Sequence, residues 1–239
     1  MEGIAAIIPH KQEIIDKYLA GMSSYQLAKD YNTFPCNISR ILNRAGYDLR
    51  EANPKLHIEL SKELRQVLDG WMLGDGHMAL PGQQSFFSHV SKHEEYRDYV
   101  SKYLENVPHR KYLYYAMGNT YYRLRTCSTV EFAEIYKKWY KDKKKIIPED
   151  IKLSPLTVNH WFMDDGTMGK RDKNIILSTN CFTKEECDKL SSQLNDILNA
   201  KDIHQNNRNE IYLSRNSANK FLEYAGECKL DCFKYKWGR

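Results

Sequence analysis

The chain has 239 residues and a formal net charge of +5 at pH 7, with 41% hydrophobic residues. This length suits one large domain or a small domain followed by a mid-sized one, and the mild positive charge permits a polyanionic partner without requiring it. The sequence has neither an apolar run long enough to span a membrane nor a signal or transit peptide, so we expect a cytoplasmic protein with no membrane partner. Six cysteines without a C-x-x-C pair predict free thiols.

The N-terminal region, residues 1–50, predicts a small all-α domain. Apolar spacing and turn residues indicate three short helices, over 11–19, 24–31 and 36–45. Ser23 and Gln26 have the spacing of a capping box at the start of the second helix. Gly46 suits the position just after the third.

The spacing within these helices is typical of a helix-turn-helix. A small residue, a turn residue that tolerates positive φ and two apolar residues stand at Ala28, Asn32, Ile38 and Ile41. The third helix would then present a polar, basic face to a DNA major groove, with Asn37, Arg40, Asn43 and Arg44 as candidate contacts. A three-helix unit with an ordinary solvated face is the alternative.

The rest of the chain contains an internal duplication after a predicted linker over 51–59. Residues 60–148 and 149–239 each follow the order helix, two strands, helix, two strands, helix. We therefore expect an α+β fold of tandem αββαββα repeats related by a pseudo-twofold axis, with a saddle-shaped pair of antiparallel sheets. The turn Gly118-Asn119 predicts a tight hairpin in the first repeat.

Each repeat begins with an apolar helix that ends on an aspartate and a glycine. The two ends read "WMLGDG" and "WFMDDG", and their aspartates are Asp75 and Asp165. If the helices pack in parallel, the two carboxylates meet at helix C-termini, where negative charge is unfavourable. Divalent cations would reverse that sign, and carboxylates that share Mg²⁺ are suited to phosphodiester hydrolysis.

These residues carry a family resemblance. "LDGWMLGDG" (68–76) and "VNHWFMDDG" (158–166) resemble the two motif copies of LAGLIDADG homing endonucleases, and the resemblance covers roughly residues 60–239. It implies a monomeric, site-specific endonuclease that binds double-stranded DNA across its sheets and leaves 3′ overhangs. It also implies Asp75 and Asp165 as ligands of catalytic Mg²⁺ or Mn²⁺, with Ca²⁺ binding without supporting cleavage. Its location would be wherever the host genome resides.

Two further segments resemble the lysine-bearing elements of single-chain members. "KKKIIPEDI" (143–151) and "FKYKWGR" at the C-terminus match Lys145 and Lys236 to the basic partners of the scissile phosphates. A solvated lysine in a charged run is the alternative for Lys145, and a purely structural lysine for Lys236.

The second motif departs from the family pattern. Asn159 and His160 stand where small residues are usual, so the helices are expected to lie farther apart there. Asp164 occupies the small seventh position, as Gly74 does in the first copy. We expect both to lie near the metal, with Asp164 as an auxiliary ligand; the alternative is that Asp164 faces solvent or pairs with a lysine.

The DNA-reading surface is expected on the outer sheet faces and the turns. Alternation along the hairpin directs Tyr121, Arg123 and Arg125 to the outer face. Turn candidates for contacts with base edges are Gln83, Gln84, Asn206, Asn207 and Arg208. The alternative functions are intron RNA maturation, with intron RNA as a second partner, and transcription regulation without cleavage.

Overall fold

The computed structural model describes residues 2–47, 56–116 and 118–238. The chain divides into two compact units, Met1–Lys55 and Leu56–Arg239, and each is described by itself. All six cysteines are free thiols. Within the described residues, no helix has the length and apolar character needed to cross a membrane.

The smaller unit is entirely helical. Its elements are α1 (Ile4–Ile7), a 3₁₀ turn η1 (Ile8–His10), α2 (Lys11–Leu19), α3 (Ser24–Asp30) and α4 (Pro35–Arg44). The capping box at the start of α3 is present, because Ser23 and Gln26 exchange hydrogen bonds. The short helix α1 and the turn η1 were not predicted, since neither has enough residues to establish a helical period.

Helices α3 and α4 meet as the spacing predicts. Ala28, Ile38 and Ile41 are buried in the core of this unit, and Asn32 has φ 45° in the turn between the helices. The prediction that Asn37 faces outward is wrong. Asn37 is 7% exposed and its amide donates to the Thr33 hydroxyl at 3.1 Å, so it closes the turn instead.

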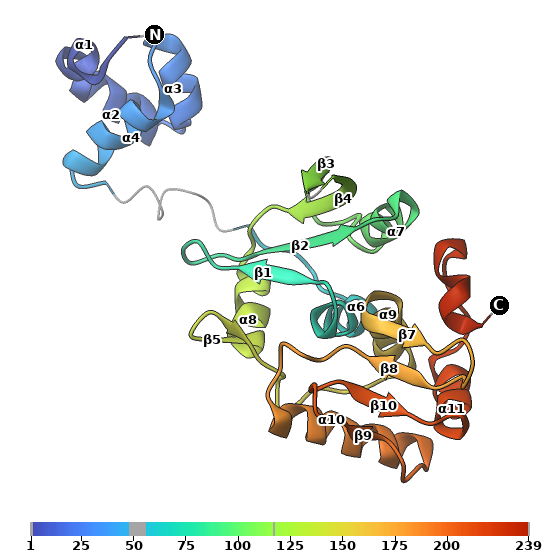
Figure 1. The fold of residues 1–239 in the computed structure, drawn as a ribbon. Helices are drawn as coiled ribbons and strands as arrows, with labels where there is room; N and C mark the ends of the chain where they lie inside the picture. The colour runs from blue at the N-terminus through green and yellow to red at the C-terminus, as the bar shows by residue number, and fades with distance from the viewer. Residues whose placement is uncertain (1, 48–55, 117, 239) are drawn as a thin grey trace. The chain divides into compact units, whose positions relative to one another are not determined.

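The larger unit contains two repeats of the same order (Figure 1). The first comprises α6 (Lys62–Leu73), β1 (His77–Ala79), β2 (Phe86–Ser91), α7 (Glu94–Tyr103), β3 (His109–Ala116), β4 (Asn119–Thr126), α8 (Val130–Trp139), β5 (Tyr140–Lys141) and β6 (Lys144–Lys145). The second comprises α9 (Pro155–Asp165), β7 (Gly166–Met168), β8 (Ile175–Leu177), α10 (Lys184–Leu198), β9 (His204–Gln205), β10 (Ile211–Leu213), α11 (Arg215–Ala225) and a 3₁₀ helix η2 (Asp231–Trp237).

The sheets of the two repeats have the same strand order. The first runs β1-β2-β4-β3 and the second β7-β8-β10-β9, and all pairs are antiparallel. Figure 1 shows the two sheets on either side of the adjacent helices α6 and α9. The predicted α+β class with a duplicated arrangement is therefore confirmed.

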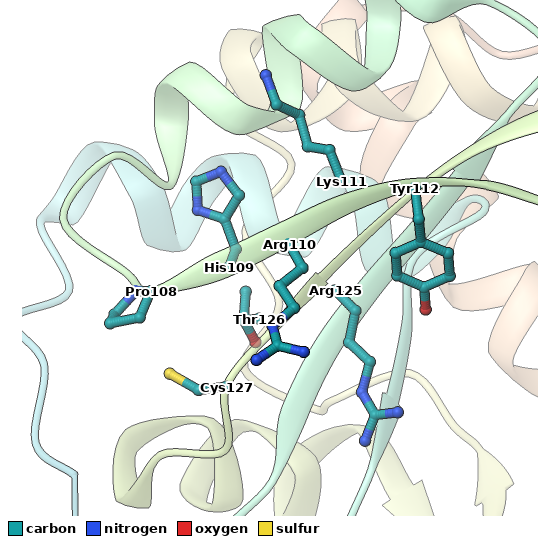
Figure 2. Close-up of a pocket in the computed structure, with 8 residues that line it drawn as sticks. All are labelled: Pro108, His109, Arg110, Lys111, Tyr112, Arg125, Thr126 and Cys127. Carbon is teal, nitrogen blue, oxygen red and sulfur yellow. The ribbon is translucent and has the colours of Figure 1, made fainter.

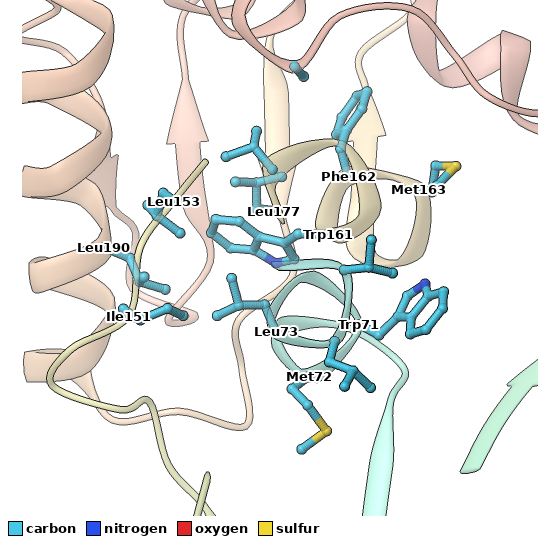
Figure 3. Packing of buried hydrophobic residues seen from close by; sticks show 14 of the residues in the cluster. Trp71, Met72, Leu73, Ile151, Leu153, Trp161, Phe162, Met163, Leu177 and Leu190 are labelled. Carbon is cyan, nitrogen blue, oxygen red and sulfur yellow. The ribbon is translucent and has the colours of Figure 1, made fainter. Parts of the chain in front are cut away.

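Helices α6 and α9 lie side by side at the centre of the core (Figure 3). They run in the same direction, because Gln66 contacts Thr157 and Gly74 faces Asp164. Trp71 and Trp161 are fully buried. A Cβ on Gly70 would lie 2.5 Å from the Thr157 carbonyl oxygen and 2.8 Å from the His160 Cβ. The expectation that His160 holds the helices apart is therefore wrong, because a glycine on the opposite helix makes room for it.

Asn159, the second bulky residue of the motif, does not face α6. Its amide donates to the carbonyl oxygens of Ala225 and Glu227 at 2.9 Å, and so it fixes the end of α11. The residue therefore adds an anchor within the second repeat without affecting the helix pair.

Two predicted boundaries differ from the structure. Residues 51–55 of the predicted linker lie outside the described residues, but Leu56 and Ile58 already hydrogen-bond to Gln84 and Glu131 of the larger unit. Residues 56–59 are therefore packed chain and not linker. Asn119 pairs with Ala116 in the hairpin ladder, so it belongs to β4 and the turn precedes it.

Candidate active site

The two motif aspartates lie at adjoining helix ends. Asp165 is the last residue of α9, and Asp75 follows the end of α6 by two residues. The Asp75 amide donates across the interface to Asp164 Oδ2 at 3.1 Å, which ties the two ends together. Asp165 is half-buried and Asp75 is exposed at the edge of the site. The structure therefore brings the expected pair of carboxylates to one place.

The electrostatics of this place disfavour charged carboxylates. Burial raises the pKa of Asp165 to about 7, and the charges of Asp75 and Asp164 add to the effect. Burial also raises the pKa of Asp75, with the charge of Asp164 as the second cause. Asp75 is exposed as a residue, but the surrounding protein removes part of the water around its carboxylate. The free chain thus holds negative charge here at a cost in free energy.

The raised pKa of Asp165 predicts how stability depends on pH. Since its pKa in the folded state is about 7 against an ordinary 3.8, the folded chain holds a proton that the unfolded chain has lost. This contribution to stability is lost as pH rises through 7. Between pH 5.5 and 8 in EDTA, the wild type should lose about 2 kcal/mol more unfolding free energy than Asp165→Asn. Chemical denaturation at each pH measures both, and equal losses would contradict the prediction.

Lys145 comes to the site on a short ribbon that the sequence does not predict. Strands β5 and β6 pair as Tyr140 with Lys145, and the turn between them has Asp142 and Lys143 at positive φ. The Lys145 ammonium donates to the carbonyl oxygens of Gly74 and Gly76 at 2.9 and 2.8 Å. Burial lowers the pKa of Lys145.

Lys236 occupies the equivalent place in the second repeat. It lies in the 3₁₀ helix η2, is 7% exposed, and donates to the carbonyl oxygens of Met163 and Asp164 at 2.5 and 2.9 Å. Burial lowers its pKa as well. Lys236 therefore binds carbonyl groups in the last turn of α9, and Lys145 binds those just beyond the end of α6, where a cation is favourable. Neither one is a solvated lysine of a charged run.

Asp164 has a different environment from the one expected. Its side chain is 0% exposed, and it accepts a hydrogen bond from the Tyr96 hydroxyl at 2.6 Å and lies 3.2 Å from His89 Nε2. It therefore neither faces solvent nor pairs with a lysine. Burial opposes the protonation of His89, but the Asp164 carboxylate outweighs it and raises the His89 pKa. A Cβ on Gly74 would overlap the Asp164 side chain, so the glycine makes this approach possible.

Comparison with known proteins identifies the family. Residues 65–221 match the model of the LAGLIDADG DNA endonuclease family. The chain belongs to this family. The homing endonuclease I-WcaI, solved bound to its DNA recognition sequence, matches with a TM-score of 0.66 and 24% identity over 75% of this chain and 88% of that one. This match establishes a LAGLIDADG fold.

Two relatives among curated proteins share part of the sequence. Cytochrome b mRNA maturase bI2 of Debaryomyces hansenii is 31% identical over an alignment of 157 positions, which covers 59% of this chain and 59% of the maturase. An uncharacterised protein of Methanocaldococcus jannaschii is 24% identical over 185 positions, covering 72% of each. The chain thus spans less than two thirds of the length of the maturase.

The oxygen ligands at the LAGLIDADG helix ends fit a hard divalent cation that takes only some of its ligands from the protein. In the described part of the chain, no group of three His, Cys, Asp or Glu side chains could hold a metal ion. Asp75 and Asp165 supply two carboxylates, and Mg²⁺ is commonly held by one or two carboxylates together with substrate phosphates. The Gly74 carbonyl oxygen accepts a hydrogen bond from Lys145, and both Asp164 oxygens accept hydrogen bonds, so the predicted roles of Gly74 and Asp164 at the metal stay predictions.

A cleft of about 370 Å³ opens beside this LAGLIDADG site. Asp75, Asp164 and Lys236 line it, together with Tyr121 of β4 and Lys92, which follows β2. Asp165 and Lys145 do not line it. Of the expected metal-binding carboxylates and lysines, the cleft therefore gives access to Asp75 and Lys236.

The outer face of the first LAGLIDADG sheet is basic and aromatic. Arg125 lies 3.7 Å from the Phe86 ring centroid and Arg123 lies 5.8 Å from that of Tyr112, which places Tyr121, Arg123 and Arg125 on the face opposite the buried Leu124. A cavity of about 700 Å³ extends this face at the edge of the hairpin. Figure 2 shows Arg110 and Arg125 pointing to the same side of the strands, with His109 and Lys111 on the other.

The expected turn contacts are only partly available. Gln84 accepts a hydrogen bond from Leu56, so it anchors the start of this unit, while Gln83 is exposed. Asn206 is used within its own turn, where its side chain bonds the Arg208 and Glu210 amides and the Glu210 carboxylate. Asn207 and Arg208 are exposed.

Proposed function

We propose that the chain is a monomeric, site-specific DNA endonuclease that cleaves both strands of its target with a divalent cation and leaves 3′ overhangs. The observation that carries this proposal is that Asp75 and Asp165 stand at adjoining ends of two buried helices, which the hydrogen bond from the Asp75 amide to Asp164 ties together, and that each end is bound by a lysine. Two motifs in one chain supply both carboxylates, so a second copy is not needed. The family and the fold support the same function.

The arrangement assigns a task to each group. Asp75 and Asp165 would hold the cation, which neutralises charge on the attacking and leaving oxygens of the phosphodiester. Lys145 and Lys236 hold the helix ends in the free chain, and each ammonium can turn from a carbonyl oxygen towards a bound phosphate. Each ammonium can then stabilise negative charge that develops on the phosphoryl oxygens.

Cleavage is expected to depend on Mg²⁺. Incubating the chain with a randomised DNA library and sequencing the cut ends should return one site, with Mg²⁺ or Mn²⁺ active. Ca²⁺ should support binding but not cutting, and EDTA should stop cutting because the two carboxylates then have no cation to share. Undiminished cleavage in EDTA, or the absence of any cut site with Mg²⁺, would contradict the proposed function.

We further propose that the N-terminal unit adds a second DNA contact. Helix α4 presents Arg40, Asn43 and Arg44 as exposed residues, and the buried Ala28 and Ile38 hold it against α3 as in a helix-turn-helix. Such a helix fits a major groove. The exposed Arg125, Asn207 and Arg208 of the larger unit are the corresponding candidates on its sheets and turns.

A double variant tests this second contact. Arg40→Ala/Arg44→Ala should weaken binding to the selected site and flatten the plot of log K against log salt by about one for each phosphate that the chain no longer neutralises. The matched control is Lys184→Ala/Lys189→Ala, which removes two exposed cations from α10 and should leave the slope unchanged. Fluorescence anisotropy over a range of salt gives both slopes. An unaltered slope in the α4 variant argues against a role in DNA binding.

Intron RNA maturation is a second candidate function, because one relative at 31% identity is a cytochrome b mRNA maturase. The two functions separate through the carboxylates. Asp165→Asn should end DNA cleavage, whereas RNA binding on a basic surface does not need a catalytic cation. The second function would be established if the chain promotes splicing of an intron RNA and the Asp165→Asn variant still promotes it.

A further inference from the structure

The two motif helices end differently. Helix α9 continues through Asp165, and the next amide, Gly166, still donates within the helix to Phe162. Helix α6 ends at Leu73, and Gly74 leaves it with φ −106° and ψ −132°. The Asp75 amide therefore has no helical partner, and the acceptor that takes its place is Asp164 Oδ2 of the other repeat.

The group that accepts from Asp75 is itself held by the first repeat. Tyr96 on α7 and His89 on β2 both contact the Asp164 carboxylate, and the His89 and Asp164 side chains are 1% and 0% exposed. Such a buried pair is stable only when its remaining lone pairs are also satisfied. Here the Tyr96 hydroxyl and the Asp75 amide satisfy them.

The described residues of the second repeat form no equivalent network. Gly166 pairs with Leu177 in its sheet, and extending the β1–β2 register by one residue places His89 opposite Gly76. Leu177 of the second repeat is thus the equivalent of His89 in the first repeat. Gly74 of the first motif is the equivalent of Asp164 in the second motif. Asp164 and His89 therefore face the end of the first motif, whereas Gly74 and Leu177 take the equivalent positions at the end of the second motif.

We propose that Asp164 is a positioning residue, held by Tyr96 and His89, that fixes the main chain at Asp75 and makes the two carboxylates of the site non-equivalent. This inference rests on the proposed function. Both Asp164 oxygens already accept hydrogen bonds, so the residue acts through Asp75 and does not bind the cation. Asp165 needs no such support because the helix itself holds its backbone.

The consequence is a difference between the two DNA strands. Loosening the network would displace Asp75 while leaving Asp165 in place. Cutting of the strand that depends on Asp75 would then require more Mg²⁺, and nicked DNA would accumulate. A residue that merely stabilised the fold would affect both strands alike.

Tyr96→Phe tests the inference, because it removes one hydroxyl and changes no charge. On a supercoiled plasmid bearing the selected site, the Mg²⁺ concentration for half-maximal rate should rise about tenfold for one strand, with nicked circles accumulating and excess Mg²⁺ restoring the rate. Tyr99→Phe is the matched control on the same helix, since its hydroxyl contacts Tyr103 and His160 and not Asp164. It should behave as the wild type.

A lower Mg²⁺ requirement in Tyr96→Phe would overturn the inference, because loosening the hold on Asp75 cannot improve cation binding. An unchanged requirement, or equal slowing of both strands, would overturn it too. A wild-type chain that cuts no DNA would overturn the proposed function and this inference with it.

A second variant covers a failure of Tyr96→Phe to fold. His89→Leu/Asp164→Gly installs the pair found at Leu177 and Gly74, which removes both buried ionisable side chains together. It should give the same accumulation of nicked circles on the same strand. Wild-type strand rates in this variant would overturn the inference.

Discussion

Replacing Asp165 with asparagine is expected to reduce DNA cleavage by at least about 1000-fold, equal to about 4 kcal/mol of transition-state stabilisation. The amide keeps the shape of the side chain but removes a charge that the cation needs. Asp75→Asn should have a similar effect, because the neighbouring acid, Asp164, is already held by Tyr96 and His89. Rates at saturating Mg²⁺ on the selected site measure the loss.

Binding should survive the same change. Asp165 adds negative charge near the DNA, and its pKa of about 7 shows that the free chain holds that charge unfavourably. Asp165→Asn should therefore bind the site with equal or greater affinity in EDTA. Asp196→Asn removes the same charge from an exposed position on α10 and serves as the control for both measurements. Full cleavage by Asp165→Asn would exclude the proposed role.

The two carboxylates could be predicted because each depends on local sequence. An apolar helix that ends on Asp-Gly directs one acid to the helix end wherever the helix lies, and the repeat of the pattern implies that two such ends meet. Lys145 and Lys236 were reached only through resemblance to the family. Nothing in their spacing predicts the β5–β6 ribbon or the 3₁₀ helix that brings them to the site.

The network around Asp164 could not be predicted because it joins three elements that are distant in sequence. Tyr96 lies on α7, His89 on β2 and Asp164 on α9, so their contact depends on how the repeats pack. His89 had no assigned role, since a lone histidine on a strand gives no signal of a buried partner. Gly74, which makes room for Asp164, was the sequence feature that could have indicated it.

The roles of the turn residues also could not be predicted from the sequence alone. Asn37 and Asn206 have the composition of DNA-reading residues, yet each bonds groups of its own turn. Asparagine serves both purposes, because its amide can bond a base edge or the nearby backbone. Only the positions of the neighbouring donors and acceptors distinguish the two.

Gly70→Ala is expected to destabilise the chain by crowding the contact between α6 and α9. Alanine favours a helix by about 1 kcal/mol over glycine, so local propensity alone predicts stabilisation. The new Cβ, however, would lie 2.5 Å from the Thr157 carbonyl oxygen, which is backbone and has no rotamer to escape. We expect a loss of about 3 kcal/mol and a Tm lower by about 6–12 °C. Gly82→Ala, with no atom within 4 Å of its Cβ, should change stability by less than about 0.5 kcal/mol. Calorimetry of both variants decides the sign, and a raised Tm in Gly70→Ala would show that α6 and α9 are not in contact at this residue.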